Sequence, residues 1–137
     1  MGADGLAGQF LRFSVVGAAG FAVDSGVLYG LMYGLGAGPY LGRAGSFLAA
    51  ASVTWFLNRI YTFRQADRAD AHRQWARFVA FMVLGGLVNY GVYAAVVALA
   101  PPHPLVPLLG VAAGSVAGLA VNFTTSRLFV FRAVSRP

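Results

Sequence analysis

Four apolar stretches, each of about 20 residues, divide the chain, and short polar or glycine- and proline-rich segments separate them. The apolar stretches cover about 13–34, 41–60, 78–99 and 105–125. A helix needs about 20 apolar residues to cross the hydrocarbon core of a bilayer. The pattern therefore predicts an all-α integral membrane protein with four transmembrane helices.

The separating segments differ in character. The segments 36–39 and 100–104 contain the glycine and proline residues that end helices. The stretch 65–76 is the most hydrophilic part of the chain, and we expect a loop or a short interfacial helix there, with Trp75 as its membrane anchor. The composition agrees with a membrane protein, since only 10% of the residues are charged, against about a quarter in soluble domains.

The ten basic residues are all arginines, and they are distributed unevenly. Arg43 falls near the turn of the first pair of helices, where we expect its side chain to reach the outer headgroups. The other nine fall near the termini or in the middle loop. Because cytoplasmic segments carry an excess of Lys and Arg, both termini and the middle loop are predicted to be cytoplasmic.

The chain also repeats itself. A shift of 68 positions superposes the stretch 54–64 (TWFLNRIYTFR) on 122–132 (NFTTSRLFVFR). A shift of 65 positions superposes Gly20 on Gly85 and Asp24 on Asn89. The match indicates an internal duplication of a helical hairpin.

Two crossings return a hairpin to its starting side of the membrane. We therefore expect two parallel-repeat hairpins that are related by an axis along the membrane normal. Repeat one covers about 9–64 and repeat two about 74–132. The whole chain, 1–137, is then a single four-helix membrane domain.

Three polar side chains, those of Asp24, Thr54 and Asn89, are predicted to lie within the membrane. At a rise of about 1.5 Å per residue, Asp24 lies roughly 18 Å beyond Arg12, near the bilayer centre. A charged carboxylate there costs at least about 2.5 to 3.5 kcal/mol unless it is paired or hydrated. Three roles stay open for Asp24: a protonated group that hydrogen-bonds Asn89 or Ser25, a proton-coupling carboxylate, and one wall of a polar path for a headgroup.

A second polar set is expected at the cytoplasmic headgroup level. Its members are Arg12, Asn58, Arg59, Arg64, Arg77, Asn122, Arg127 and Arg132. Guanidinium groups form paired hydrogen bonds with phosphate oxygens, so the set predicts a site for a lipid phosphate or diphosphate. The alternative is that these arginines only fix the topology. That alternative is weaker for Arg59 and Arg127, because the same aromatic-x-aromatic-Arg pattern follows both of them.

The sequence carries no pattern typical of an enzyme. It contains no cysteine, and its two histidines, His72 and His103, lie far apart in the sequence. We therefore expect no metal site and no cofactor. No combination of nucleophile and base and no glycine-rich phosphate loop is present either, so the chain is not expected to be an enzyme.

Several short motifs resemble those of the GtrA-like family of small four-helix membrane proteins. They are R-F-x-x-V-G at 12–17, V-D at 23–24, F-L-N-R-I-Y-T-F at 56–63, R-F at 77–78 and N-F-x-x-S-R-L-F-V-F at 122–131. The resemblance covers nearly the whole chain, and its most specific element is N-R-x-aromatic-x-F. One departure is Ser126, which stands where the first repeat has Asn58. Because of this departure the two repeats are not equivalent, and we expect only one of them to bind a ligand tightly.

The resemblance implies a multi-pass protein of a bacterial-type cytoplasmic (inner) membrane with a role in cell-surface polysaccharide synthesis. The implied function is the translocation, or flipping, of a polyprenyl-phosphate-linked sugar. The alternative is a non-transporting accessory subunit that anchors or orients a membrane glycosyltransferase through the basic loop 64–77. A small proton-coupled exporter with Asp24 as its coupling group is a third hypothesis, which the basic character of the expected site disfavours.

The expected partners follow from these functions. They are a polyprenyl-phosphate lipid or its sugar-linked form, membrane lipids and, under the alternative, a glycosyltransferase. No nucleic acid is expected. The ridges of small residues on the helices also allow a homodimer, since such ridges let helices approach closely in a membrane.

Overall fold

The computed structural model describes residues 5–68 and 70–133, and nearly all of them are helical. The first hairpin consists of α1 (Leu6–Tyr29) and α2 (Pro39–Leu57), and the second of α3 (Ala71–Leu99) and α4 (Val106–Thr125). Single π-helical turns continue three of these helices: η1 (Gly30–Gly34), η2 (Asn58–Thr62) and η3 (Ser126–Val130). The prediction of an all-α fold is confirmed.

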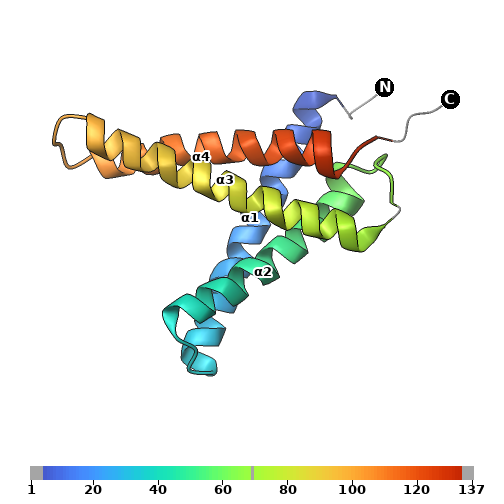
Figure 1. Cartoon of the computed structure of the whole chain (residues 1–137), viewed down its shortest axis with the longest axis horizontal. Coiled ribbons are helices and arrows are strands. Elements are labelled where there is room, and N and C mark those ends of the chain that lie inside the picture. The colour runs from blue at the N-terminus through green and yellow to red at the C-terminus, as the bar shows by residue number, and fades with distance from the viewer. Residues whose placement is uncertain (1–4, 69, 134–137) are drawn as a thin grey trace.

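The two hairpins meet at one end and diverge from it toward their turns (Figure 1). At this end, which we call the joined end, α1 begins, η3 ends, and the loop between η2 and α3 crosses from one hairpin to the other. The backbone N–H of Asp67 in that loop donates to the carbonyl of Arg132 at 2.9 Å. The joined end therefore holds the hairpins together, and the space between them widens away from it.

Three helical spans are long and apolar enough to cross a membrane: Leu6–Gly34, Ala71–Leu99 and Val106–Val130. The helix α2 is not in this set, because Arg43 and its many small or polar residues lower its mean hydropathy. The chain is thus a membrane protein with three apolar spans and a fourth helix that packs against α1 (Figure 1).

Aromatic residues form the core of the joined end. Phe13 of α1 and Phe78 of α3 are buried there together with Phe63, Phe123 and Phe131. The rings of Phe63 and Phe131 stack with their centroids 4.9 Å apart and their planes 11° apart. Each hairpin contributes rings to this one cluster, so burial of aromatic surface joins the hairpins.

The π turns η2 and η3 give these two phenylalanines the same geometry. The N–H of Phe63 donates to the Asn58 carbonyl at 2.8 Å, and the N–H of Phe131 donates to the Ser126 carbonyl at 2.7 Å. Both phenylalanines then leave the helix with nearly equal backbone angles, φ −113° and ψ 59° against φ −104° and ψ 61°. The two hairpins therefore end alike at positions 68 residues apart, and the interpretation of this likeness as a duplication stays a prediction.

Two predicted boundaries are wrong. The helix α1 begins at Leu6 rather than near 13, and α3 begins at Ala71 rather than near 78. The second half of the stretch 65–76, where a loop or a short interfacial helix was expected, is therefore helical and continuous with the apolar span. The reason for the longer α3 is the buried Gln74, whose side chain contacts the first hairpin and the loop. Trp75 also donates its indole N–H to Ser52 of α2 at 2.9 Å. Its expected role as a membrane anchor stays a prediction.

Candidate functional site

The joined end carries a cavity of about 360 Å³ that we call the rim pocket. Its lining residues are Gln9, Thr62, Phe63, Arg64, Gln65, Ala66, Arg127, Leu128, Phe131, Arg132 and Ala133. They come from the start of α1, from η2 and the loop after it, and from η3 and the residues after it. Both hairpins thus contribute to its walls.

The rim pocket is strongly basic. Arg64, Arg127 and Arg132 line it, all three are exposed, and no acidic side chain is among its lining residues within the described chain. Arg127 donates from Nε to Oε1 of Gln9 at 3.1 Å, and Arg64 donates from Nε to the carbonyl of Tyr61 at 3.2 Å. These bonds fix two guanidinium groups at their inner nitrogens. Fixed, exposed guanidinium groups are suited to paired hydrogen bonds with phosphate oxygens.

A second cavity of about 360 Å³ lies between the two hairpins, and we call it the interhairpin cleft. Its polar lining residues are Asp24, Arg43, Thr54, Asn58, Asn89, Ser115 and Asn122. The remaining lining residues are apolar or glycine. The cleft is therefore a mostly apolar groove with a few polar groups, which is a common form of small-ligand site.

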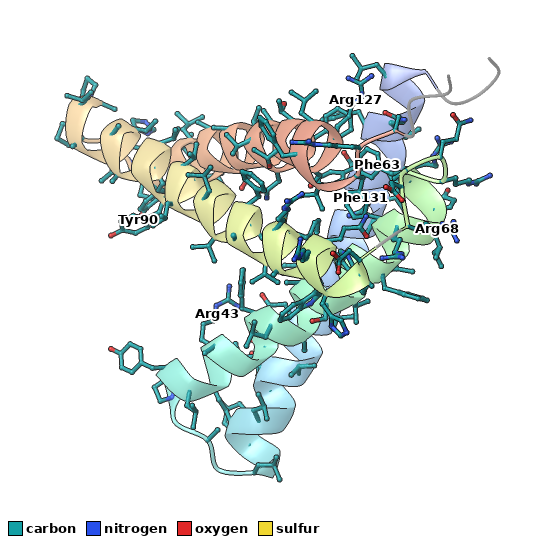
Figure 2. The ribbon with its side chains drawn as sticks, turned by 45° about the vertical axis from the view of Figure 1, so that its right-hand side comes forward. Arg43, Phe63, Arg68, Tyr90, Arg127 and Phe131 are labelled. Carbon is teal, nitrogen blue, oxygen red and sulfur yellow. The ribbon has the colours of Figure 1, made fainter. Side chains whose placement is uncertain are left out.

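The cleft contains an ion pair that was not predicted from the sequence. Arg43 donates from Nη1 to Oδ2 of Asp24 at 2.6 Å, so α2 is tied to α1 by an ion pair. Figure 2 shows Arg43 projecting from α2 into the space between the hairpins. The expectation that Arg43 reaches away to the outer headgroups is wrong, because the carboxylate of Asp24 in an apolar helix attracts it. Asn89, the expected neighbour of Asp24, lines the same cleft, but the partner of Asp24 is Arg43.

Small residues bring the uncharged polar groups of the cleft close to the neighbouring helix. A Cβ atom at Gly20 would overlap the methyl group of Thr54, and a Cβ atom at Gly85 would overlap the amide of Asn122. The Oδ1 atom of Asn122 is shielded from solvent and accepts no hydrogen bond from any part of the chain that the structure describes. The amide oxygen of Asn122 is packed against α3 at Gly85.

Asn58, which was expected at the headgroup level, lines the cleft. Its side chain is 2% exposed, and its Oδ1 atom accepts a hydrogen bond from the hydroxyl of Thr62 at 2.7 Å. Thr54, one turn deeper, donates its hydroxyl to the carbonyls of Ala50 and Ala51 at 2.9 and 3.1 Å. Both residues belong to the polar wall that α2 and η2 give to the cleft.

The aromatic core separates the two cavities. Phe63 and Phe131 line the rim pocket, whereas Phe13 and Phe78 line the cleft. The rings of Phe13 and Phe63 are in edge contact at 6.2 Å, as are those of Phe78 and Phe131 at 5.9 Å. One layer of aromatic rings therefore stands between the basic end and the polar interior.

Three arginines of the predicted phosphate set line neither of these cavities. Arg59 donates to Gln74 Oε1 at 2.9 Å and to the Arg68 carbonyl at 2.6 Å, and its guanidinium lies over the Trp55 ring at 5.4 Å. These contacts brace the loop at the joined end. The guanidinium of Arg12 lies 6.0 Å from the centre of the Tyr61 ring.

The third of these arginines, Arg77, lines a smaller cavity of about 210 Å³. The other residues of that cavity include Asp67, Asp70, Arg73 and Arg132, so it carries both signs of charge. The structure thus divides the predicted headgroup-level set into three groups. Arg64, Arg127 and Arg132 line the rim pocket, Asn58 and Asn122 line the cleft, and the other three arginines lie outside both cavities.

The sequence-based prediction missed three polar residues that line the rim pocket, Gln9, Thr62 and Gln65, and one that lines the cleft, Ser115. It also assigned Arg43 to the wrong environment. A signal for Arg43 was present, because a carboxylate in an apolar helix needs a cation nearby, and Arg43 is the cation on the neighbouring helix. The glutamines carried no such signal, since polar residues near a helix end are common.

The fold defines a multi-pass helical membrane protein, with one basic cavity and one polar cleft. Residues 12–131 match the family described as GtrA/DPMS, transmembrane domain, and the chain belongs to that family. Membership implies involvement in the translocation of lipid-linked sugars at a membrane, and members of this family are generally not catalytic. Among curated proteins, none was found to match the chain.

Proposed function

We propose that this protein flips a polyprenyl-phosphate-linked sugar across a bacterial-type cytoplasmic membrane. The observation that carries the proposal is the rim pocket, where Arg64 from one hairpin and Arg127 and Arg132 from the other line one cavity. Its volume of about 360 Å³ falls within the range of about 300 to 1,000 Å³ that small-ligand sites occupy. A phosphate with part of a sugar is the headgroup that this basic pocket suits best.

The interhairpin cleft supplies the second part of the proposal. Its amide and hydroxyl groups can hydrogen-bond sugar hydroxyls, and the gap between diverging hairpins leaves room for the prenyl chain to stay in the lipid. The headgroup would have to pass the aromatic layer at the joined end. Transport by this route therefore requires the stacked rings of Phe63 and Phe131 to move apart.

The topology that fits this route has four crossings. The helix α2 packs along α1, and with η2 it spans Pro39–Thr62, which is about 36 Å at 1.5 Å per residue. With four crossings the whole joined end lies on one side of the membrane, and its excess of arginines favours the cytoplasmic side. The chain has no cysteine, so Leu35→Cys and Gln65→Cys can be labelled singly. Labelling of both variants from the same side of the membrane would contradict this topology.

Arg64→Gln combined with Arg127→Gln tests the proposal in proteoliposomes that contain a polyprenyl-phosphate sugar. A hydrogen bond to a charged group contributes about 1.5 to 3 kcal/mol, and 1.4 kcal/mol is a factor of ten in affinity. We therefore expect the double variant to bind and transport the lipid at least about tenfold less well. Arg73→Gln is the matched control, because Arg73 is exposed and lines neither the rim pocket nor the cleft.

The proteoliposome assay, together with a glycosyltransferase pull-down, distinguishes a flippase from an accessory subunit. The side chains of Arg68 and Arg73 are exposed near the joined end, which is where a docked glycosyltransferase would contact the basic loop. If the folded wild-type protein moves no lipid above the rate of empty liposomes, the flippase proposal fails. Loss of glycosyltransferase recovery in Arg68→Gln and Arg73→Gln, with lipid binding retained, would then favour the accessory function.

A further inference from the structure

We infer that Arg43 binds phosphate at a second site, which lies within the interhairpin cleft. While the cleft holds no headgroup, the carboxylate of Asp24 is bonded to the guanidinium group of Arg43. The inference rests on the proposed function, because it assigns a receiving site to a headgroup that has left the rim pocket. The ligand class is a lipid-linked phosphate. The carboxylate of Asp24 and the phosphate then compete for one guanidinium group.

The position of Arg43 supports a site separate from the rim pocket. Arg43 lies in the second turn of α2, fifteen residues before Asn58, which corresponds to about 22 Å along the helix. Figure 2 shows it apart from Arg127 and Arg68, which lie at the joined end. Arg43 is the one cation that lines the cleft within the described chain. A phosphate inside the cleft therefore has this guanidinium as its charged partner.

The contact between Arg43 and Asp24 leaves unused bonding capacity on both sides. The structure gives the guanidinium group of Arg43 a single hydrogen bond, from Nη1 to Oδ2, and the side chain is 59% exposed. Asp24 is 17% exposed, and its Oδ1 atom is shielded from solvent and has no partner among residues 5–68 and 70–133. The ion pair is therefore bonded at a single point, with bonding capacity left on the guanidinium group and on Oδ1.

A phosphate can take the place of Asp24 in this single-point contact, and the displaced carboxylate then has to be hydrated or protonated, because an unpaired charge within a membrane is costly. Guanidinium groups bind phosphate through two parallel hydrogen bonds, which are stronger and more directional than one. Arg43 lines the cleft that the headgroup would enter, and more than half of its side chain is exposed. Asp24 keeps the empty cleft close to neutral, because an unpaired guanidinium within a membrane is costly. The guanidinium group of Arg43 is therefore an anion site that holds the Asp24 carboxylate until a phosphate, which binds it more strongly, displaces it.

Farnesyl phosphate, a short prenyl monophosphate, tests the competition with the full-length protein in a maltoside detergent, which carries no phosphate. Asp24→Asn removes the competing carboxylate, and we expect binding to become about tenfold tighter. Arg43→Gln should weaken binding by about the same factor. The double variant Asp24→Asn/Arg43→Gln should bind like Arg43→Gln alone. Asp70→Asn is the matched control, because Asp70 lies at the joined end outside the cleft.

The outcomes separate this inference from the proposed function. Unchanged or weaker binding by folded Asp24→Asn, with the rim variant Arg64→Gln/Arg127→Gln still impaired, overturns the role of Arg43 and leaves the proposed function standing. Absence of farnesyl phosphate binding by the wild-type protein overturns both. Binding of inorganic phosphate as tight as that of farnesyl phosphate overturns the assignment to a lipid.

A measurement that keeps Asp24 covers the case in which its variant does not fold. The chain has four acidic residues, all aspartates, so the background Asp67→Asn/Asp70→Asn retains Asp4 and Asp24 as its side-chain carboxylates. Addition of farnesyl phosphate should shift a carboxylate band in the infrared difference spectrum, because Asp24 loses its guanidinium partner. Saturating ligand with no change in that band overturns the competition.

Discussion

The two hairpins of this protein end alike and differ inside. Both leave their second helix through a π turn, and both place a phenylalanine into one shared aromatic core. Both also use a glycine on the first helix to accommodate a polar residue of the second, Thr54 in one hairpin and Asn122 in the other. The common features are those that join the halves. The features that differ lie along the cleft.

Helix packing is the first difference. A Cβ atom at Gly114 of α4 would come within 2.5 Å of the backbone carbonyl oxygen of Asn89, so α3 and α4 approach with their backbones close together. In the first hairpin, a Cβ atom at Gly42 of α2 would meet side-chain atoms of Met32 at 3.1 Å and Leu28 at 3.4 Å. The second hairpin is therefore the tighter of the two.

Charge is the second difference. The ion pair of Asp24 and Arg43 belongs to the first hairpin, whereas the corresponding positions of the second hold Asn89 and the apolar Val111. The second hairpin thus presents neutral amides to the cleft and the first presents charges. The tightly packed second hairpin therefore faces the cleft with neutral groups, and the more loosely packed first hairpin faces it with an ion pair. This arrangement suits the proposed exchange of the Asp24 carboxylate for a phosphate on Arg43.

Phe131→Ala tests the common feature and should have the largest effect on stability. Replacement of a buried phenylalanine by alanine in a packed core costs about 3 to 5 kcal/mol. Phe63 and Phe131 stack on each other and are 4% and 3% exposed, so we expect Phe63→Ala to cost about as much. Thermal unfolding in detergent, followed by circular dichroism, measures both.

Phe129→Ala is the control for this pair, since Phe129 lies next to the core residues in sequence and is 44% exposed. We expect a clearly smaller loss of stability from it. A loss for Phe131→Ala that far exceeds the loss for Phe63→Ala would show that the hairpins do not contribute equally to the joined end.

Much of the fold could be predicted from the sequence, because hydrophobic segment length is a strong signal in membrane proteins. The four helices, their pairing into hairpins and the breaks at the turns follow from apolar stretches and from glycine and proline. The start of α3 could not be predicted, because it depends on contacts of Gln74 with Trp55 and Arg59 in the other hairpin. Such long-range contacts leave no periodic pattern in the sequence.

The candidate site was predicted as a set of residue types rather than as an arrangement. Arginines near the cytoplasmic ends and polar residues within the helices were identified, and the structure distributes them over two cavities. Arg59 and Arg64 carry similar sequence signals, yet only Arg64 lines the rim pocket. The difference depends on which acceptor each guanidinium reaches, and that is decided by the path of the loop at the joined end.

Gly114→Ser tests the packing difference between the hairpins. The shift of 68 positions aligns Gly114 with Ser46, a fully buried residue of α2 whose hydroxyl donates to the carbonyl of Arg43 at 3.1 Å. The first hairpin thus holds at this level a side chain that the second has no room for. Overpacking in a well-packed interior costs about 1 to 3 kcal/mol, and we expect Gly114→Ser to lose about 2 kcal/mol in the free energy of unfolding.

The reverse change and a control complete this test. Ser46→Gly removes a small side chain without forcing helices apart, so its cost should stay near the roughly 1 kcal/mol that glycine costs in a helix interior. Gly91→Ala, on α3 where a Cβ atom would meet nothing within 4 Å, should leave the protein as stable or slightly more stable. If Gly114→Ser is tolerated as well as Gly91→Ala, α3 and α4 are no closer than α1 and α2. The two hairpins would then differ in charge, through Asp24 and Arg43, and not in how closely their helices pack.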